Sequence, residues 1–119
     1  PLERMCGILA ILGSSLPEKD LRKLAAAMSR LQRHRGPDWS GVYSQTLTVG
    51  DASTTTALAH ERLAIVDPIS GEQPLFARDD DSLILVVNGE IYNHKALRAD
   101  FADEHTFRTE VRTDTLMLS

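Results

Sequence analysis

Apolar positions recur along the chain with two different periods, and each period predicts a different kind of element. Cys6 to Leu12 is a short apolar run that Gly13 ends, which predicts a buried strand. After Pro17 the apolar period lengthens to three and four residues, which is typical of one face of a helix. The residues on that face are Leu21, Leu24, Ala25, Met28 and Leu31. Turn-forming residues at Gly36 to Asp38 predict where the helical stretch stops.

Strand-favouring segments dominate the rest of the chain. Residues 42–49 and 57–66 predict two strands, and the small polar residues from Gly50 to Thr55 predict a hairpin loop between them. Leu83 to Val87 is a continuous apolar run, which predicts a strand covered on both faces. Two further helices are expected, a short one at Lys95 to Ala102 and another that starts near Asp114.

Composition excludes several classes of protein. The chain has 119 residues, enough for one domain, and a formal net charge of −4 with no run of Lys or Arg, so nucleic-acid binding has no electrostatic support. Its apolar runs are far shorter than the roughly 20 residues that a membrane span requires, and no signal peptide is visible. The single cysteine rules out an internal disulfide framework. We therefore expect a globular domain in a reducing compartment, the cytoplasm.

Both ends of the sequence prompt expectations about processing. Met5 stands directly before Cys6, which predicts that translation starts at Met5 and that residues 1–5 are a leader or an upstream extension. The last residues form an apolar run, Leu116 to Leu118, without the Gly or Asn that usually follows a helix. This predicts a chain that is truncated on its C-terminal side.

Cys6 is the first candidate for chemistry. A lone cysteine is most often a small buried apolar residue. If Met5 is removed, however, Cys6 carries both a thiol and a free α-amine. An α-amine has a reference pKa of about 7.7–8.0, so it can act as a general base and take the thiol proton without a histidine.

Two other segments offer groups that a substrate could use. Asn88-Gly89 is a tight-turn dipeptide, but the Asn amide and the Gly N–H are also the kind of donor pair that stabilises an oxyanion. Arg62 lies in a charged block at the end of a predicted strand. Such residues are often only the solvated end of a strand, but a guanidinium group can also hold a carboxylate bidentately.

The block Arg33 to Gly41 is dense in turn formers, and we interpret it as a structural turn with Trp39 packed beneath it. The histidines at positions 34, 60, 94 and 105 have no spacing typical of metal ligands, so no metal site is predicted.

Four sequence blocks together resemble the glutamine-hydrolysing domain of glutamine-dependent asparagine synthetases, which belong to the class II glutamine amidotransferases. The blocks are Met5-Cys6-Gly7-Ile8, His34 to Gly41, His60 to Asp67 followed by Gly71 to Leu75, and Asn88 to His94. The resemblance implies an α+β fold, the four-layer αββα sandwich of N-terminal-nucleophile hydrolases. Residues 6–119 would form part of such a domain.

The resemblance also implies a role for each matching residue. Cys6 would attack the side-chain amide of glutamine, and Asn88 with Gly89 would stabilise the oxyanion. Arg62 would bind the substrate α-carboxylate. The other expected contacts with glutamine are Leu63, Ala64, Ile65, Val66 and Glu90.

The residue that holds the substrate α-amine is less well defined. The family has an Asp at this place, followed two residues later by a Glu. An ungapped alignment puts Arg112 at the Asp position and Asp114 at the Glu position. A two-residue insertion makes Asp114 the ligand, with Leu116 in place of the Glu. We favour Asp114, because a cation cannot hold an ammonium group.

The implied reaction is hydrolysis of glutamine to glutamate and ammonia, which needs no cofactor. Ammonia would pass to a C-terminal synthetase domain that uses ATP and Mg²⁺ to convert aspartate to asparagine, and these residues contain no phosphate-binding loop. We expect the chain as given, beginning at Pro1, to be inactive. Two alternatives are a non-catalytic amidotransferase fragment and an amidotransferase that serves another acceptor. Downstream sequence and a glutaminase assay would separate them.

Overall fold

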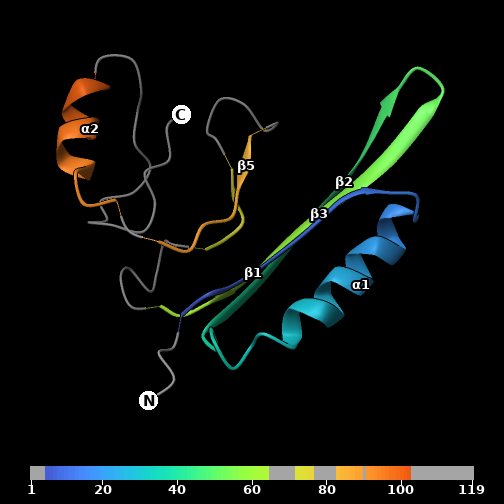
Figure 1. The fold of residues 1–119 in the computed structure, drawn as a ribbon, viewed down its shortest axis with the longest axis horizontal. Coiled ribbons are helices and arrows are strands. Elements are labelled where there is room, and N and C mark those ends of the chain that lie inside the picture. The colour runs from blue at the N-terminus through green and yellow to red at the C-terminus, as the bar shows by residue number, and fades with distance from the viewer. Residues whose placement is uncertain (1–4, 65–71, 77–82, 90, 103–119) are drawn as a thin grey trace.

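The computed structural model describes residues 5–64, 72–76, 83–89 and 91–102, and these form an α+β arrangement with antiparallel sheets (Figure 1). The elements, in chain order, are β1 (Gly7–Ser14), α1 (Glu18–Arg30), β2 (Trp39–Val49), β3 (Ala52–Arg62), β4 (Leu75–Phe76), β5 (Ile84–Leu85) and α2 (His94–Asp100). Neither helix in this part of the chain is long and apolar enough to cross a membrane.

The main sheet has the strand order β1-β3-β2, with β3 antiparallel to both neighbours. Gly7 at the start of β1 pairs with Glu61 near the end of β3, and Trp39 at the start of β2 pairs with Arg62. The start of β1, the start of β2 and the end of β3 therefore meet at one end of the sheet. The sequence blocks around Cys6, Trp39 and Arg62 are brought together by this register.

Helix α1 covers one face of the main sheet (Figure 1). Leu21 and Ala25 are fully buried against Ala57, and Leu9, Ile11 and Val42 pack around them. Side chains alternate along a strand, so Thr55, Ala57, Ala59 and Glu61 of β3 all face the helix. The small side chains at Ala57 and Ala59 leave room for α1 to lie close to the sheet.

The predicted helical face is only partly buried. Leu21 and Ala25 are buried as expected, but Leu24, Met28 and Leu31 are 43%, 40% and 76% exposed. Ser29 is buried as well, because it lies four residues after Ala25 on the same helical face, and its hydroxyl donates to Glu61 at 2.8 Å. The helix also ends earlier than predicted: α1 stops at Arg30, and turns occupy residues 31–35.

The loop predicted at Gly50 to Thr55 is wrong in extent. Only Gly50 and Asp51 form the turn, and β3 begins at Ala52. Gly50 has φ of 62°, a backbone conformation that glycine adopts without steric cost. The Ser and Thr residues after it continue the strand, because hydroxyl pairs join β2 to β3 there: Thr48 to Ser53 at 2.9 Å and Thr46 to Thr55 at 3.0 Å.

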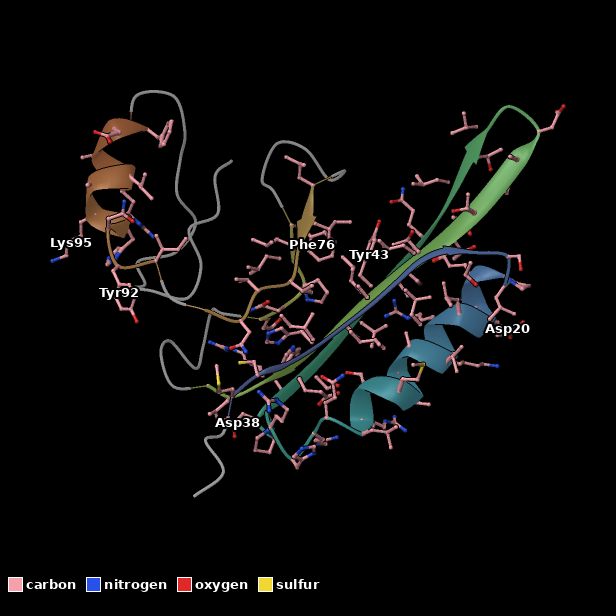
Figure 2. The ribbon with its side chains drawn as sticks, viewed as in Figure 1. Asp20, Asp38, Tyr43, Phe76, Tyr92 and Lys95 are labelled. Atoms are coloured by element: carbon pink, nitrogen blue, oxygen red, sulfur yellow. The ribbon has the colours of Figure 1, made fainter. Side chains whose placement is uncertain are left out.

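A second, two-stranded sheet pairs Leu75 of β4 with Leu85 of β5. It lies on the face of the main sheet opposite α1, where the rings of Tyr43 and Phe76 pack in a T-shaped arrangement with their centroids 5.6 Å apart (Figure 2). The predicted strand at Leu83 to Val87 shrinks to Ile84–Leu85, and it is not covered on both faces, since Leu83 is 62% exposed and Leu85 is 42% exposed. Helix α2 confirms the prediction of a short helix near Lys95.

Candidate active site

Cys6 lies next to the end of β3. Continued by one residue, the pairing of Gly7 with Glu61 puts Cys6 opposite Arg62 and next to Leu63. The Leu63 N–H donates to Cys6 Sγ at 3.3 Å, and Sγ lies 3.8 Å from the Leu63 carbonyl oxygen. The Leu63 backbone therefore contacts the sulfur through both of its polar groups.

Two side chains from distant segments reach the backbone of Cys6. Arg35, in the turn after α1, donates from Nε to the Cys6 carbonyl oxygen at 3.4 Å. Asn88 donates from Nδ2 to the same oxygen at 3.5 Å across a sequence separation of 82 residues. Asn88 and Gly89 are both exposed, so their polar groups are open to a ligand. The structure thus brings the predicted nucleophile and the predicted oxyanion donors into one neighbourhood.

A pocket of about 460 Å³ lies at the same end of the sheet. Its lining residues are Asp38, Trp39, Arg62, Ala64 and Glu72. Asp38 fixes the segment that follows β3: its N–H donates to the Arg62 carbonyl at 3.0 Å, and its Oδ2 accepts the Ala64 N–H at 2.8 Å. Figure 2 shows Asp38 at this end of the main sheet. The predicted substrate residues Arg62 and Ala64 therefore line one cavity, and Leu63 between them contacts Cys6.

The charged end of β3 is buried. His60 and Glu61 are fully buried and Arg62 is 4% exposed, so the interpretation of this block as a solvated strand end is wrong. Glu61 Oε1 accepts hydrogen bonds from Ser29 at 2.8 Å and from Ser40 at 2.7 Å. These hydroxyls offset part of the cost of burying a carboxylate, since Oε2 has no hydrogen-bond partner among the described residues.

His60 faces the opposite side of the sheet from Glu61. Its Nε2 donates to the Val87 carbonyl at 3.1 Å. Burial lowers the pKa of His60, with a smaller lowering from the Arg62 charge, while the hydrogen bond to Val87 and the charge of Glu61 oppose this effect. A neutral imidazole with its proton on Nε2 fits this environment.

Several predicted site residues cannot be placed. Ile65, Val66, Glu90 and Asp114, and the alternative Arg112, lie outside the described residues. Within the described part of the chain, no group of three or more His, Cys, Asp or Glu side chains is arranged to hold a metal ion.

Four residues of this neighbourhood were not predicted from the sequence. Arg35, Asp38 and Trp39 lie in the block that we interpreted as a structural turn, and Glu72 lies in a predicted loop. Trp39 is not packed beneath the turn, since it is 42% exposed and lines the pocket. The available signal was the density of charged residues among the turn formers, which a purely structural turn does not require.

Comparison with known proteins relates this geometry to a family. The sequence model described as a glutamine amidotransferase domain matches residues 5–119. The chain is 49% identical over 105 residues to the glutamine-hydrolyzing asparagine synthetase B of Escherichia coli strain K12, which covers 88% of this chain and 17% of the bacterial protein. It is 49% identical over 112 residues to the glutamine-hydrolyzing root asparagine synthetase of Pisum sativum, covering 94% of this chain and 18% of the plant protein.

A third relative is the glutamine-hydrolyzing asparagine synthetase 1 of Arabidopsis thaliana, 50% identical over 105 residues, or 88% of this chain and 16% of that protein. The chain therefore spans only 16–18% of the length of these curated relatives. The family match, in contrast, covers nearly the whole chain, and it includes Cys6, the block around Asp38, the end of β3 and Asn88. The chain belongs to the glutamine amidotransferase domain family.

Proposed function

We propose that this domain hydrolyses glutamine to glutamate and ammonia, with Cys6 as an N-terminal nucleophile. The observation that carries the proposal is the meeting at Cys6 of three separate segments: Leu63 on the sulfur, and Arg35 and Asn88 on the carbonyl oxygen. A lone structural cysteine needs no such environment. Family membership supports the same chemistry.

The first half of the reaction forms a thioester. The free α-amine of Cys6 takes the thiol proton, and the thiolate attacks the side-chain amide carbon of glutamine. The amide oxygen becomes an oxyanion, which the Asn88 amide and the Gly89 N–H stabilise; one such donor is worth about 3 kcal/mol in the transition state. The α-amine then returns its proton to the leaving nitrogen, and the carbon–nitrogen bond breaks to release ammonia.

The second half regenerates the enzyme. The α-amine removes a proton from water, and the hydroxide attacks the glutamyl thioester. The carbon–sulfur bond breaks, glutamate leaves, and the sulfur is protonated again. Neither half requires a metal or an organic cofactor.

The pocket beside Leu63 suits the rest of the substrate. Arg62 would hold the α-carboxylate through its planar pair of donors, and Leu63 and Ala64 would line the side-chain path. On the basis of the family motif alone, we assign Ile65, Val66 and Glu90 as contacts with glutamine and Asp114 as the ligand of the substrate α-amine.

We further infer that the domain is the N-terminal part of a longer protein, called the parent enzyme below. The matched relatives are glutamine-hydrolyzing asparagine synthetases. In the parent enzyme, ammonia would pass to a synthetase domain that uses ATP and Mg²⁺ with aspartate. The four-layer αββα sandwich is part of the same proposal, supported by α1 on one face of the main sheet and β4–β5 on the other.

The experiment compares two N-termini of the parent enzyme. One form begins at Cys6 and the other keeps residues 1–5, with each N-terminus checked by mass. An amide nitrogen has no basic lone pair, so only the form with a free Cys6 amine should release glutamate. Ammonia-dependent asparagine synthesis should be equal in both forms.

Three other results would change the proposal. Equal glutaminase rates would overturn the N-terminal-nucleophile mechanism. No glutamate release from the form that begins at Cys6 would favour a non-catalytic domain. Glutamate release without asparagine formation would indicate another acceptor.

A further inference from the structure

Val87 is held by two buried side chains. Gln73 contacts both of its polar backbone groups: Gln73 Oε1 accepts the Val87 N–H at 2.8 Å, and Gln73 Nε2 donates to the Val87 carbonyl at 3.1 Å. His60 Nε2 donates to the same carbonyl at 3.1 Å. Val87 lies beyond the end of β5 at Leu85. The two side chains therefore satisfy the backbone N–H and carbonyl of Val87, which a neighbouring strand would satisfy inside a sheet.

Gln73 and His60, called the Val87 clamp below, are both buried. Gln73 is 6% exposed and His60 is fully buried. His60 comes from the middle strand of the main sheet, and Gln73 precedes β4. The His60 ring must donate through Nε2, because a carbonyl oxygen only accepts, and its Nδ1 has no partner among the described residues.

Gly41 makes room for the clamp. It lies opposite His60 in the pairing of β2 with β3. A Cβ atom built at Gly41 would overlap the Gln73 carbonyl oxygen and would lie 3.1 Å from Pro74 Cδ. The absence of a side chain at this position lets the Gln73 backbone rest directly on the main sheet.

We propose that Gln73 and His60 are positioning residues that set the oxyanion-binding pair Asn88 and Gly89. The inference rests on the proposed function. The Val87 carbonyl belongs to the peptide bond between Val87 and Asn88. Two hydrogen bonds to its oxygen therefore fix the orientation of this peptide plane, and with it the backbone position of Asn88. The exposed Asn88 side chain itself has only a long bond of 3.5 Å to Cys6 among the described contacts. The position of the oxyanion donors therefore depends on the hydrogen bonds that hold Val87.

The first test measures glutamine hydrolysis by the parent enzyme that begins at Cys6. Gln73→Leu removes both bonds of Gln73 at similar volume, and kcat should fall about 10–100-fold, because a small misplacement of a catalytic group costs that much. KM should change less than about threefold, since Gln73 does not line the substrate pocket. Ammonia-dependent synthesis should be unchanged.

Conservative variants separate positioning from folding. His60→Gln keeps an amide N–H near the place of Nε2 and should retain most of kcat, whereas His60→Leu should lose about 10-fold. Gln73→Glu keeps the acceptor for the Val87 N–H but loses the donor, so its kcat should lie between wild type and Gln73→Leu. Equal kcat in the conservative and the apolar variants would overturn the proposal.

Thr55→Val is the matched control. It removes a hydroxyl that is 3% exposed and bonds Thr46 at 3.0 Å, far along β3 from His60. Its thermal stability should fall as in Gln73→Leu, while its kcat stays at the wild-type value. A similar kcat loss in Thr55→Val would mean that Gln73 acts only through global stability.

A double-mutant cycle tests the route of action. If Gln73 works through Asn88, then Gln73→Leu should cost less than about threefold in an Asn88→Ala background. Full additivity of the two losses would overturn the proposal, even if each single variant is impaired.

Hydrogen exchange at the Val87 amide tests the clamp without any activity. Exchange should be slow in wild type and at least about 10-fold faster in Gln73→Leu, because the N–H loses its acceptor. Unchanged exchange would overturn the clamp. An inactive parent enzyme would overturn the proposed function and the catalytic role together, whereas an active one with additive variants would overturn this inference alone.

Discussion

The two ends of the β2–β3 hairpin use polar side chains in opposite ways. At the distal end, residues 48–53, the hydroxyls of Thr48 and Ser53 bond each other at 2.9 Å in full contact with solvent. At the proximal end, residues 39–41 and 60–62, His60 and Glu61 are fully buried and Arg62 is 4% exposed. The strand pairing is continuous between the two ends, so the backbone does not cause the difference.

The difference lies in what covers each end. The proximal end has α1 on one face, through Ser29 and Glu61, and the segment around Val87 on the other, through His60. Burial of a polar group without a partner costs about 1–3 kcal/mol. This end of β3 supplies partners for Glu61 Oε1 and His60 Nε2, whereas Glu61 Oε2 and His60 Nδ1 have none among the described residues. The proximal end concentrates these groups beside Cys6 and the pocket, whereas the distal end is a solvated hairpin.

Among substitutions at the two ends of the hairpin, we expect the largest loss of stability at Glu61. Glu61→Ala leaves two hydroxyls without their acceptor, that of the buried Ser29 and that of the exposed Ser40, and the free energy of unfolding should fall by about 2–4 kcal/mol. Urea denaturation of the chain measures this. Glu61→Gln keeps an acceptor oxygen at the same place and should cost less than about 1 kcal/mol. Equal losses in the two variants would show that the side-chain volume matters and the hydrogen bonds do not.

The next effect concerns the chemistry of Arg62. Arg62→Lys replaces a planar pair of donors with a single ammonium group, and the KM for glutamine in the parent enzyme should rise about 10–100-fold. Arg22→Lys, on the exposed surface of α1, is the matched control and should leave KM unchanged. An unchanged KM in Arg62→Lys would remove Arg62 from the carboxylate site.

Much of the fold could be predicted because it depends on local patterns. The periods of apolar residues gave β1, α1 and the β2–β3 pair in the right order, and the turn at Gly50 was expected within a longer loop. The loop was overestimated because Ser53, Thr54 and Thr55 are polar, whereas their hydroxyl pairs and β-branched side chains extend the strand.

The site could be predicted only where a motif identified it. Cys6, Arg62 and Asn88 were found through their sequence blocks, but the buried state of His60 and Glu61 was not. Their partners Val87, Ser29 and Ser40 are 27, 32 and 21 residues away along the chain. No local period reports such contacts, because they depend on which faces the tertiary fold brings together.

The pH is expected to have a smaller effect on stability, through His60. The folded-state pKa of His60 is lowered, first by burial and then by Arg62, against the opposing effects of the Val87 carbonyl and Glu61. The unfolded chain, with a His pKa near 6.5, then binds a proton that the folded chain does not, so stability is complete above about pH 6.5 and falls as pH decreases below it. Urea denaturation at about pH 7.5, 6.5 and 5.5 should show this slope in wild type and in the exposed-site control His34→Gln. His60→Gln should flatten it, and an equal slope there would assign the effect to other groups.

We expect the smallest change in the free energy of unfolding from substitutions at the distal end of the hairpin. Thr48→Val keeps the β-branched shape that suits a strand and removes only a hydroxyl that water already reaches. Water replaces the lost partner of Ser53, so the free energy of unfolding should change by less than about 0.5 kcal/mol and kcat should stay the same. Ser40→Ala removes one hydroxyl from the proximal end, at 2.7 Å from Glu61, and should cost about 1–2 kcal/mol. The two substitutions remove the same chemical group from exposed residues of the same strand, so the difference lies in the partner: Ser40 bonds the fully buried carboxylate of Glu61, whereas Thr48 bonds the exposed Ser53. Equal losses would mean that a hydrogen bond to the buried Glu61 carboxylate contributes no more than a bond within a solvated pair.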